Sequence, residues 1–141
     1  MTREETVAFF DRRQAATARH DVAALGDLYA DDCVLESPLA GGTVTGRAVV
    51  EQVSRKWFTA FPDVVTQPEE LLVDGDRVVL ISTLAGTDTG GFLGLAPTGK
   101  SFRLPIVYLC ALKDRRIVHE RRIYDFTGLL VQIGNLKAKP V

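Results

Sequence analysis

The sequence predicts an α+β fold in which helices come first and long strands follow. Up to Pro62, apolar residues recur three and four positions apart, which is the spacing of amphipathic helices. After Pro62, long apolar runs are separated by turn pairs, of which Asp74-Gly75 is the strongest hairpin signal. With 141 residues, 46% of them hydrophobic, the chain can bury one substantial core. We therefore expect a single domain over residues 1–141.

The N-terminal part is expected to hold two helices and a short strand. Thr2, followed three residues later by a glutamate, forms a capping box and predicts a helix to about Arg19. Asp21 can cap a second helix. A strand is expected at Cys33–Ser37, and a glycine-bearing loop at Leu39–Gly46.

A third helix is predicted over residues 47–61. Val50, Val53 and Trp57 lie on one side of such a helix, and Pro62 ends it. The segments beyond it are expected to be strands, at Val64–Val73, Arg77–Thr87, Ser101–Lys113 and Arg116–Asp125. A helical turn over 127–133, with Thr127 as its cap, closes the chain. A curved, mostly antiparallel sheet with helices on one face would leave a cavity between the two layers.

The charge pattern argues against nucleic-acid and membrane partners. The net charge is −1, and the 17 basic residues form no long run. The longest nearly apolar run, Leu104–Leu112, is about half the length of a membrane span. No apolar signal core follows the N-terminus, and Cys33 and Cys110 lie in apolar runs far apart, as buried thiols do. We expect a soluble cytoplasmic protein.

A phosphate-loop pattern, G-x-x-x-x-G-K-[ST], occurs at Gly94–Ser101. Such a loop needs a helix directly after it, so that the N-terminus of the helix faces the phosphates. Pro105 and the β-branched and aromatic residues that follow Ser101 predict a strand instead. The segment is therefore better explained as a loop between two strands, and nucleotide binding is disfavoured.

Four segments resemble the SnoaL-like polyketide cyclases, a family with the cone-shaped NTF2-like fold. They are AFPD at Ala60–Asp63, GTDTG at Gly86–Gly90, PTGK at Pro97–Lys100 and DFTGLLVQIG at Asp125–Gly134. The second segment departs from the family's GTHTG pattern, because Asp88 stands where the family usually has histidine.

The resemblance implies an enclosed apolar pocket for a polycyclic or aromatic keto ester, and a homodimer. It also implies that Asp125 is a general acid/base group for an intramolecular aldol closure without metal or cofactor. A carboxylate suits this role if apolar walls raise its pKa. From its position alone, Asp125 could instead cap the last helical turn.

Two other functions remain open at this stage. Asp88 could pair with Asp125 as a second catalytic carboxylate, or it could be a turn residue. If Arg103 or Arg122 bridged the two carboxylates, the site would resemble that of an epoxide hydrolase of the same fold. A non-catalytic domain that binds a hydrophobic molecule is the third possibility.

The candidate substrate-binding residues are aromatic and polar side chains expected near the pocket: Tyr29, Glu36, Trp57, Phe61, Phe92, Arg103, Tyr108 and Arg122. The aromatic residues could equally be plain core, and Glu36 could face solvent. Because side chains alternate along a strand, Arg103 and Tyr108 are expected on opposite faces unless Pro105 introduces a bulge. The same alternation places Arg122 on one face of the last strand together with Glu120 and Tyr124.

Overall fold

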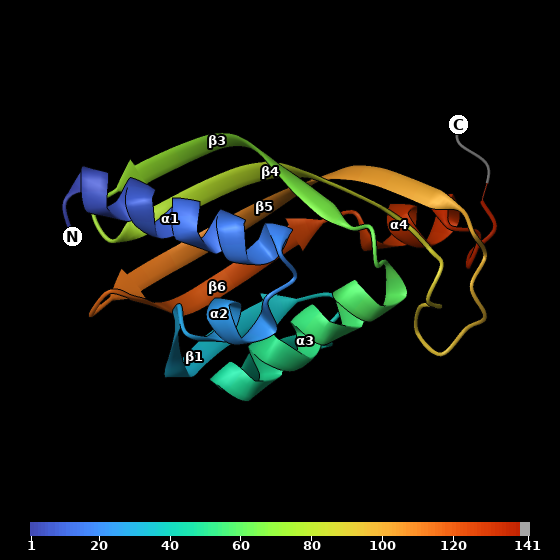
Figure 1. Cartoon of the computed structure of the whole chain (residues 1–141), viewed down its shortest axis with the longest axis horizontal. Coiled ribbons are helices and arrows are strands. Elements are labelled where there is room, and N and C mark those ends of the chain that lie inside the picture. Colours follow the sequence, from blue (N-terminus) through green and yellow to red (C-terminus); the bar gives the residue numbers. More distant parts are fainter. Residues whose placement is uncertain (139–141) are drawn as a thin grey trace.

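The molecule has two layers, with helices packed on one face of a six-stranded sheet. The structure is a computed structural model, and it describes residues 1–138. Figure 1 shows α1 (Arg3–Ala18), α2 (Val22–Gly26) and α3 (Arg47–Ala60) in front of the sheet, whereas α4 (Phe126–Gln132) lies at one end. The predicted α+β class is confirmed.

Helix capping follows the sequence expectations at both N-terminal helices. The Thr2 hydroxyl accepts a hydrogen bond from the backbone N–H of Glu5 at 3.1 Å, and the Glu5 carboxylate accepts one from the Thr2 N–H. Asp21 accepts a hydrogen bond from the Ala24 N–H at 3.0 Å. Side-chain acceptors thus satisfy backbone donors that have no partner inside the helix.

The sheet is mixed, with the strand order β2-β1-β6-β5-β4-β3. Its strands are β1 (Tyr29–Ser37), β2 (Gly42–Thr45), β3 (Val65–Asp74), β4 (Arg77–Thr87), β5 (Ser101–Lys113) and β6 (Arg116–Tyr124). The β1–β6 pair is parallel and every other pair is antiparallel. The last strand in sequence therefore lies in the interior of the sheet, next to the first.

Apart from one-residue shifts at the ends of several elements, three features differ from the sequence expectations. Strand β2 lies within the segment that was expected to be a loop. The sequence does not reveal it, because a four-residue edge strand with glycine and threonines has no alternating apolar pattern. Strand β1 begins at Tyr29, with an irregularity before Val34 that interrupts its pairing with β6. Helix α4 is capped by Asp125, whose side chain accepts from the Gly128 N–H, and not by Thr127.

Side chains alternate strictly along β5, the longest strand. Phe102, Ile106 and Tyr108 belong to a set of buried even-numbered residues that face the helices. Arg103 is exposed on the other face, so the predicted opposition of Arg103 and Tyr108 is confirmed. The inner face of the sheet and the apolar sides of the helices together form one hydrophobic core.

The β4–β5 loop, residues 88–100, runs directly into strand β5. Because a strand and not a helix follows Lys100, the phosphate-loop pattern lacks the helix N-terminus on which its function depends. The sequence-based preference for a loop between strands is confirmed. Residues 89–99 contain no charged side chain.

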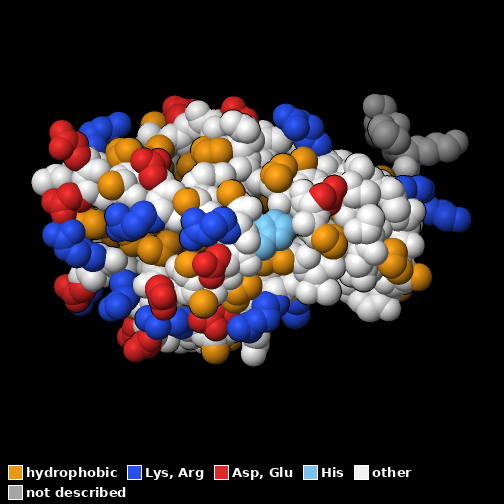
Figure 2. All heavy atoms as spheres, viewed as in Figure 1, with side chains coloured by type: hydrophobic (Ala, Val, Ile, Leu, Met, Phe, Trp, Pro, Cys, Tyr) orange, Lys and Arg blue, Asp and Glu red, His pale blue; other side chains and the backbone are white. Residues whose placement is uncertain are grey.

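The helical face carries charges of both signs, whereas the end formed by the β4–β5 loop has few (Figure 2). Within residues 1–138, no helix combines the length and the apolar character needed to cross a membrane.

Candidate functional site

A small cavity of about 50 Å³, the inner cavity, lies between the helices and the inner face of the sheet. Three helices and four strands or their flanks contribute to its wall. Its lining residues are Arg13, Thr17, Leu25, Ser54, Trp57, Phe58, Val64, Thr66, Leu84, Ile106, Tyr108 and Arg122. Most of the wall is apolar, so the two arginines and the tyrosine give the cavity its chemical character.

Behind the two arginines lies a fully buried carboxylate, that of Glu120. Its Oε1 atom is 3.1 Å from Nη2 of Arg13 and accepts a 2.7 Å hydrogen bond from the hydroxyl of Tyr29. Its Oε2 atom accepts a 2.9 Å hydrogen bond from Nε of Arg122. Strand β6 positions Glu120 and Arg122 two residues apart on its inner face, and α1 supplies Arg13. We call Arg13, Tyr29, Glu120 and Arg122 the Glu120 cluster.

The Glu120 cluster keeps its central carboxylate ionised. Burial alone would raise the pKa of Glu120, but the charges of Arg122 and Arg13 and the hydrogen bonds from Tyr29 and Arg122 outweigh it, so the pKa lies below its ordinary value. Burial raises the pKa of Tyr29 and of Cys110, which keeps the phenol and the thiol neutral. Two guanidinium groups facing one carboxylate leave the cluster with a net charge of +1.

The excess positive charge is directed toward the inner cavity. The Arg13 guanidinium lies 4.3 Å from the ring centre of Tyr108, and that of Arg122 lies 5.6 Å from it. The Nε atom of Arg13 is buried without a hydrogen-bond partner among residues 1–138. In the same part of the chain, neither the Tyr108 hydroxyl nor the terminal nitrogens of Arg122 have a hydrogen-bond acceptor. These N–H and O–H donors are free for an oxygen atom of a ligand.

The arrangement suits the stabilisation of negative charge on oxygen. Fixed donors on buried side chains interact with a developing oxyanion more strongly than water does. The lining of the inner cavity, as described for residues 1–138, contains no carboxylate, imidazole or thiol. The cavity thus supplies electrostatic stabilisation directly, whereas a carboxylate base would have to reach it from elsewhere.

Asp125, the acid/base candidate, lies outside the lining of the inner cavity. Its side chain is exposed, and one carboxylate oxygen accepts a 2.8 Å hydrogen bond from the Gly128 N–H at the start of α4. In this position Asp125 performs the capping role that its place in the sequence also allowed.

Asp88, the second catalytic candidate, is fully buried inside the β4–β5 loop. Its carboxylate accepts hydrogen bonds from the Gly91 N–H at 3.0 Å and from the N–H and hydroxyl of Thr98, each at 3.1 Å. Its backbone N–H donates to the carbonyl of Lys100 at 2.9 Å. Asp88 therefore holds the two ends of the loop together.

The structure does not assemble the parts that epoxide hydrolysis would require. That reaction needs two carboxylates bridged by an arginine, whereas the Glu120 cluster has one carboxylate between two arginines. Neither Asp88 nor Asp125 forms an ion pair within residues 1–138.

Of the substrate-binding candidates, Trp57, Tyr108 and Arg122 line the inner cavity. Tyr29 is buried one layer behind it, bonded to Glu120. The remaining four lie elsewhere. Phe61 and Phe92 belong to the aromatic core, with their ring centres 5.0 Å apart, Glu36 pairs with His119 at 2.7 Å, and Arg103 faces outward on β5.

Sequence reasoning missed Arg13 and Glu120 as site residues. Arg13 occupies an apolar stripe of α1, four residues after Phe9 and three before Ala16, both of which are buried. A charged residue on such a stripe needs a buried partner of opposite charge. The position of Arg13 on the apolar stripe was therefore a signal in the sequence that it belongs to a buried polar cluster. Glu120 was placed correctly on the face of Arg122, but its partner on α1 could not be identified from strand alternation.

Solved structures with the same architecture include proteins suggested to be enzymes and proteins of unassigned function. AclR from Streptomyces galilaeus, for which hydroxylase activity has been suggested, is 26% identical and superimposes with a TM-score of 0.85 over 99% of this chain and 91% of its own. IdmH from Streptomyces antibioticus, suggested to be a polyketide cyclase, is 25% identical, with a TM-score of 0.77 over 91% of this chain and 97% of its own.

A third structure identifies the fold by name. A protein from Catenulispora acidiphila with a ketosteroid isomerase-like fold, solved with trimethylamine, is 20% identical and has a TM-score of 0.77 over 92% of this chain and 97% of its own. No match is found among curated protein sequences. The present chain therefore has the NTF2-like fold that the resemblance implied, which is also described as ketosteroid isomerase-like.

The sequence itself agrees with this structural likeness. Residues 9–133 match the SnoaL-like polyketide cyclase family over most of the chain. The matched span includes the inner cavity and all four members of the Glu120 cluster. The chain belongs to the SnoaL-like polyketide cyclase family.

Proposed function

We propose that the protein is a cofactor-independent enzyme that forms and stabilises the enolate of an apolar or aromatic keto compound in the inner cavity, as in an intramolecular aldol cyclisation. The observation that carries the proposal is the net positive charge of the Glu120 cluster, combined with unpaired donors at the wall of a small, mostly apolar cavity. The wall is chemically suited to an apolar ring system and the donors to a carbonyl oxygen, but the cavity of about 50 Å³ would have to widen to admit one.

Enolate formation places negative charge on the oxygen that these donors can hold. When a base removes a proton from the carbon beside a carbonyl, the electron pair moves onto the carbonyl oxygen. The hydroxyl of Tyr108 and the guanidinium of Arg122 would then donate hydrogen bonds to this oxygen. The enolate carbon next attacks a second carbonyl of the same molecule, a carbon–carbon bond forms, and the resulting alkoxide takes up a proton.

The base for the first step remains a separate proposal. The family resemblance assigns this role to Asp125, but its carboxylate caps α4 in the structure. A neutral phenol cannot take up this proton, so Tyr108 is assigned the role of oxyanion donor. The carboxylate of Asp125, once released from Gly128, would accept the α-proton and return it to the alkoxide. The two roles make different predictions for single substitutions.

Hydrogen–deuterium exchange at carbon tests enolate formation without knowledge of the natural product. An aromatic ketone such as 2-tetralone is incubated with the protein in D₂O, and loss of the α-proton NMR signal is measured. We expect the protein to accelerate exchange and Tyr108→Phe to reduce the acceleration about 100-fold, the usual effect of removing one oxyanion donor. Folding of this variant should be little affected, because phenylalanine keeps the ring against which Arg13 and Arg122 pack.

Tyr29→Phe is the matched control, because its hydroxyl donates to Glu120 and does not reach the cavity lining. This variant should lose stability and keep the exchange rate. If Tyr108→Phe and Tyr29→Phe accelerate hydrogen–deuterium exchange of the ketone equally well, the proposal for the inner cavity is wrong. If instead Asp125→Asn alone abolishes exchange while folding is intact, Asp125 is the essential acid/base group, as the family resemblance implies.

We also propose that the protein forms a homodimer through the outer face of the sheet. Ile81, Val107 and Ile123 form a row of paired apolar residues across β4, β5 and β6 on that face, and Ile123 is 47% exposed. Analytical ultracentrifugation should give twice the monomer mass. Val107→Glu should yield monomers, whereas Arg103→Glu on the same face should not. A monomeric unsubstituted protein would contradict the proposal.

A further inference from the structure

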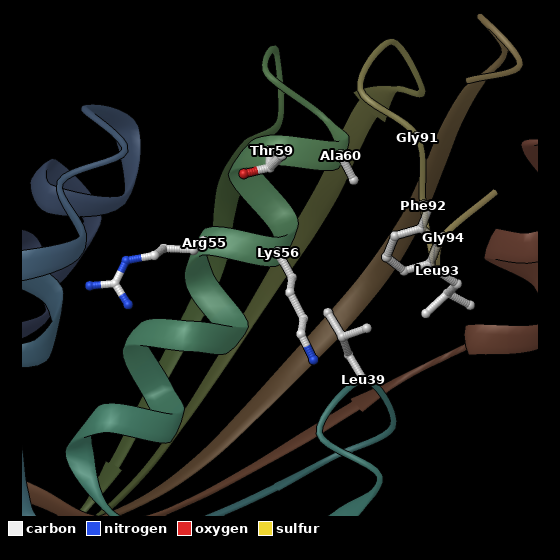
Figure 3. Close-up of a pocket in the computed structure, with 9 residues that line it drawn as sticks. All are labelled: Leu39, Arg55, Lys56, Thr59, Ala60, Gly91, Phe92, Leu93 and Gly94. Atoms are coloured by element: carbon white, nitrogen blue, oxygen red, sulfur yellow. The ribbon is translucent and has the colours of Figure 1, made fainter. Parts of the chain in front are cut away.

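A second cavity, larger and open to solvent, lies between the C-terminal half of α3 and the start of the β4–β5 loop. This outer cavity has a volume of about 380 Å³, within the range of small-molecule sites. Its floor is formed by Leu39, Ala60 and Phe92, which are buried, although the space above them is open. In Figure 3 the side chains of Leu39, Phe92 and Leu93 lie across the cavity from α3.

The outer cavity is distinct from the inner cavity, since no residue lines both. Two aromatic rings lie at their boundary. Trp57 lines the inner cavity, Phe92 lines the outer one, and their ring centres are 5.9 Å apart. Phe61, which is fully buried, packs against both rings. A ligand in the outer cavity would therefore contact Phe92, whose ring packs against Trp57 at the inner cavity.

Leu93, at the edge of the outer cavity, has a conformation and an exposure that packing does not explain. Its φ angle is +54°, a left-handed conformation that costs a residue with a Cβ atom about 1 kcal/mol or more. Its side chain is nevertheless 53% exposed, and Leu95 nearby is 51% exposed. A strained backbone that presents an apolar side chain to solvent beside a cavity is a feature of ligand-binding loops.

The charge at the outer cavity is positive. Lys56 and Arg55 are its only charged lining residues within the described part of the chain. Arg55 points away from the cavity in Figure 3 and lies 3.5 Å from the carboxylate of Glu51. Lys56 extends along the cavity toward Leu39 and forms no ion pair within residues 1–138. One cation above an apolar floor complements an amphipathic anion.

We propose that the outer cavity binds an aromatic carboxylate, with its rings against Leu39, Phe92 and Leu93 and its carboxylate at the ammonium group of Lys56. The proposal is independent of the enolate chemistry assigned to the inner cavity, because it uses none of the same residues. It gives the β4–β5 loop, whose residues 89–99 are uncharged and whose ends are held together by Asp88, a function in ligand recognition.

The test uses 2-naphthoate as the probe and amide NMR as the readout. Titration into ¹⁵N-labelled protein should shift the amide signals of Thr59, Gly91 and Gly94, which line the outer cavity, and leave those of Thr17 and Thr66, which line the inner one, in place. Lys56→Met keeps the apolar stem of the side chain and removes the charge. It should weaken 2-naphthoate binding about 2- to 5-fold, the range expected for an exposed ion pair.

Two controls separate charge recognition from general effects. Binding of the neutral analogue 2-naphthalenemethanol should be the same for the unsubstituted protein and for Lys56→Met. Lys113→Met, at the far end of β5, should leave 2-naphthoate binding unchanged. If both lysine variants bind 2-naphthoate equally well, the charge assignment is wrong.

Leu93→Gly tests the role of the loop, because it should affect thermal stability and ligand binding in opposite directions. Glycine relieves the left-handed strain, so the melting temperature should stay the same or rise. Loss of the apolar side chain should weaken binding of both naphthyl probes several-fold. Unchanged probe binding by Leu93→Gly, or amide shifts confined to the inner cavity, would overturn the proposal and leave the test of the inner cavity unaffected.

Discussion

Arg13 and Glu120 are 107 residues apart in the chain, yet the Nη2 and Oε1 atoms of their side chains are 3.1 Å apart in the interior. Their side chains are 5% and 0% exposed. This ion pair ties the first helix to the last strand behind the inner cavity. Each partner depends on the other, because an isolated charge in such a position would be strongly unfavourable.

Arg13→Met should therefore destabilise the protein by about 3 kcal/mol or more, since it leaves Glu120 buried with one of its two cations. Urea denaturation monitored by circular dichroism measures the change. Arg12→Met is the matched control, because Arg12 is the exposed neighbour in the same helix. Its effect should stay within about 0.5 kcal/mol. Equal effects of the two substitutions would show that the buried pair contributes nothing.

Stability should fall in acid through protonation of Glu120. Its pKa is lower in the folded protein than in the unfolded chain, so the stabilisation is complete above the unfolded value, about 4.3, and is lost as the pH falls through the folded value. The midpoint of urea unfolding, measured from pH 7 to pH 2.5, follows this loss. Glu120→Gln should be less stable at pH 7 and have a shallower decline below pH 4. Parallel curves for the two proteins would contradict the assignment.

Asp88→Asn should loosen the β4–β5 loop. An amide oxygen can replace only one of the two carboxylate oxygens, and the NH₂ group would face a donor at Thr98 or Gly91. We expect a loss of about 1.5 to 3 kcal/mol and faster hydrogen exchange at the Gly91 and Thr98 amides, with strand amides unaffected. Asp76→Asn, in the exposed β3–β4 turn, is the control. Loss of catalysis with normal loop protection would instead favour a chemical role for Asp88.

Gly90→Ala should be more disruptive than Gly94→Ala, although both residues lie in the same loop. A Cβ atom at residue 90 would overlap the carbonyl oxygen of Thr59 at the end of α3, where the Gly90 N–H donates to Ala60. A Cβ atom at residue 94 would meet nothing within 4 Å, and the substitution costs only the strain of its φ of +74°, about 1 kcal/mol. Melting temperatures compare the two. Equal values would mean that the loop does not depend on its contact with α3.

The sequence predicted the elements well where local rules determine them. Strands β4 and β5 have the expected bounds, because long alternating patterns end at recognisable turns. The Asp125 side chain illustrates the limit. Its position supported both a catalytic and a capping role, and only the coordinates place it at Gly128 and away from the inner cavity. The pairing of Arg13 with Glu120 depends on tertiary packing between distant segments, which spacing along the chain does not encode.

The central position of β6 also has a consequence for synthesis on the ribosome. Because β6 pairs with β1 on one side and β5 on the other, the sheet remains in two unconnected parts until residues 116–124 have emerged. Glu120, the carboxylate that pairs with Arg13, belongs to the same strand, so α1 cannot bury Arg13 as an ion pair until β6 has been synthesised. Contacts of this sequence separation make folding slow, and the unpaired edges of β1 and β5 would be exposed to association with other chains during that interval.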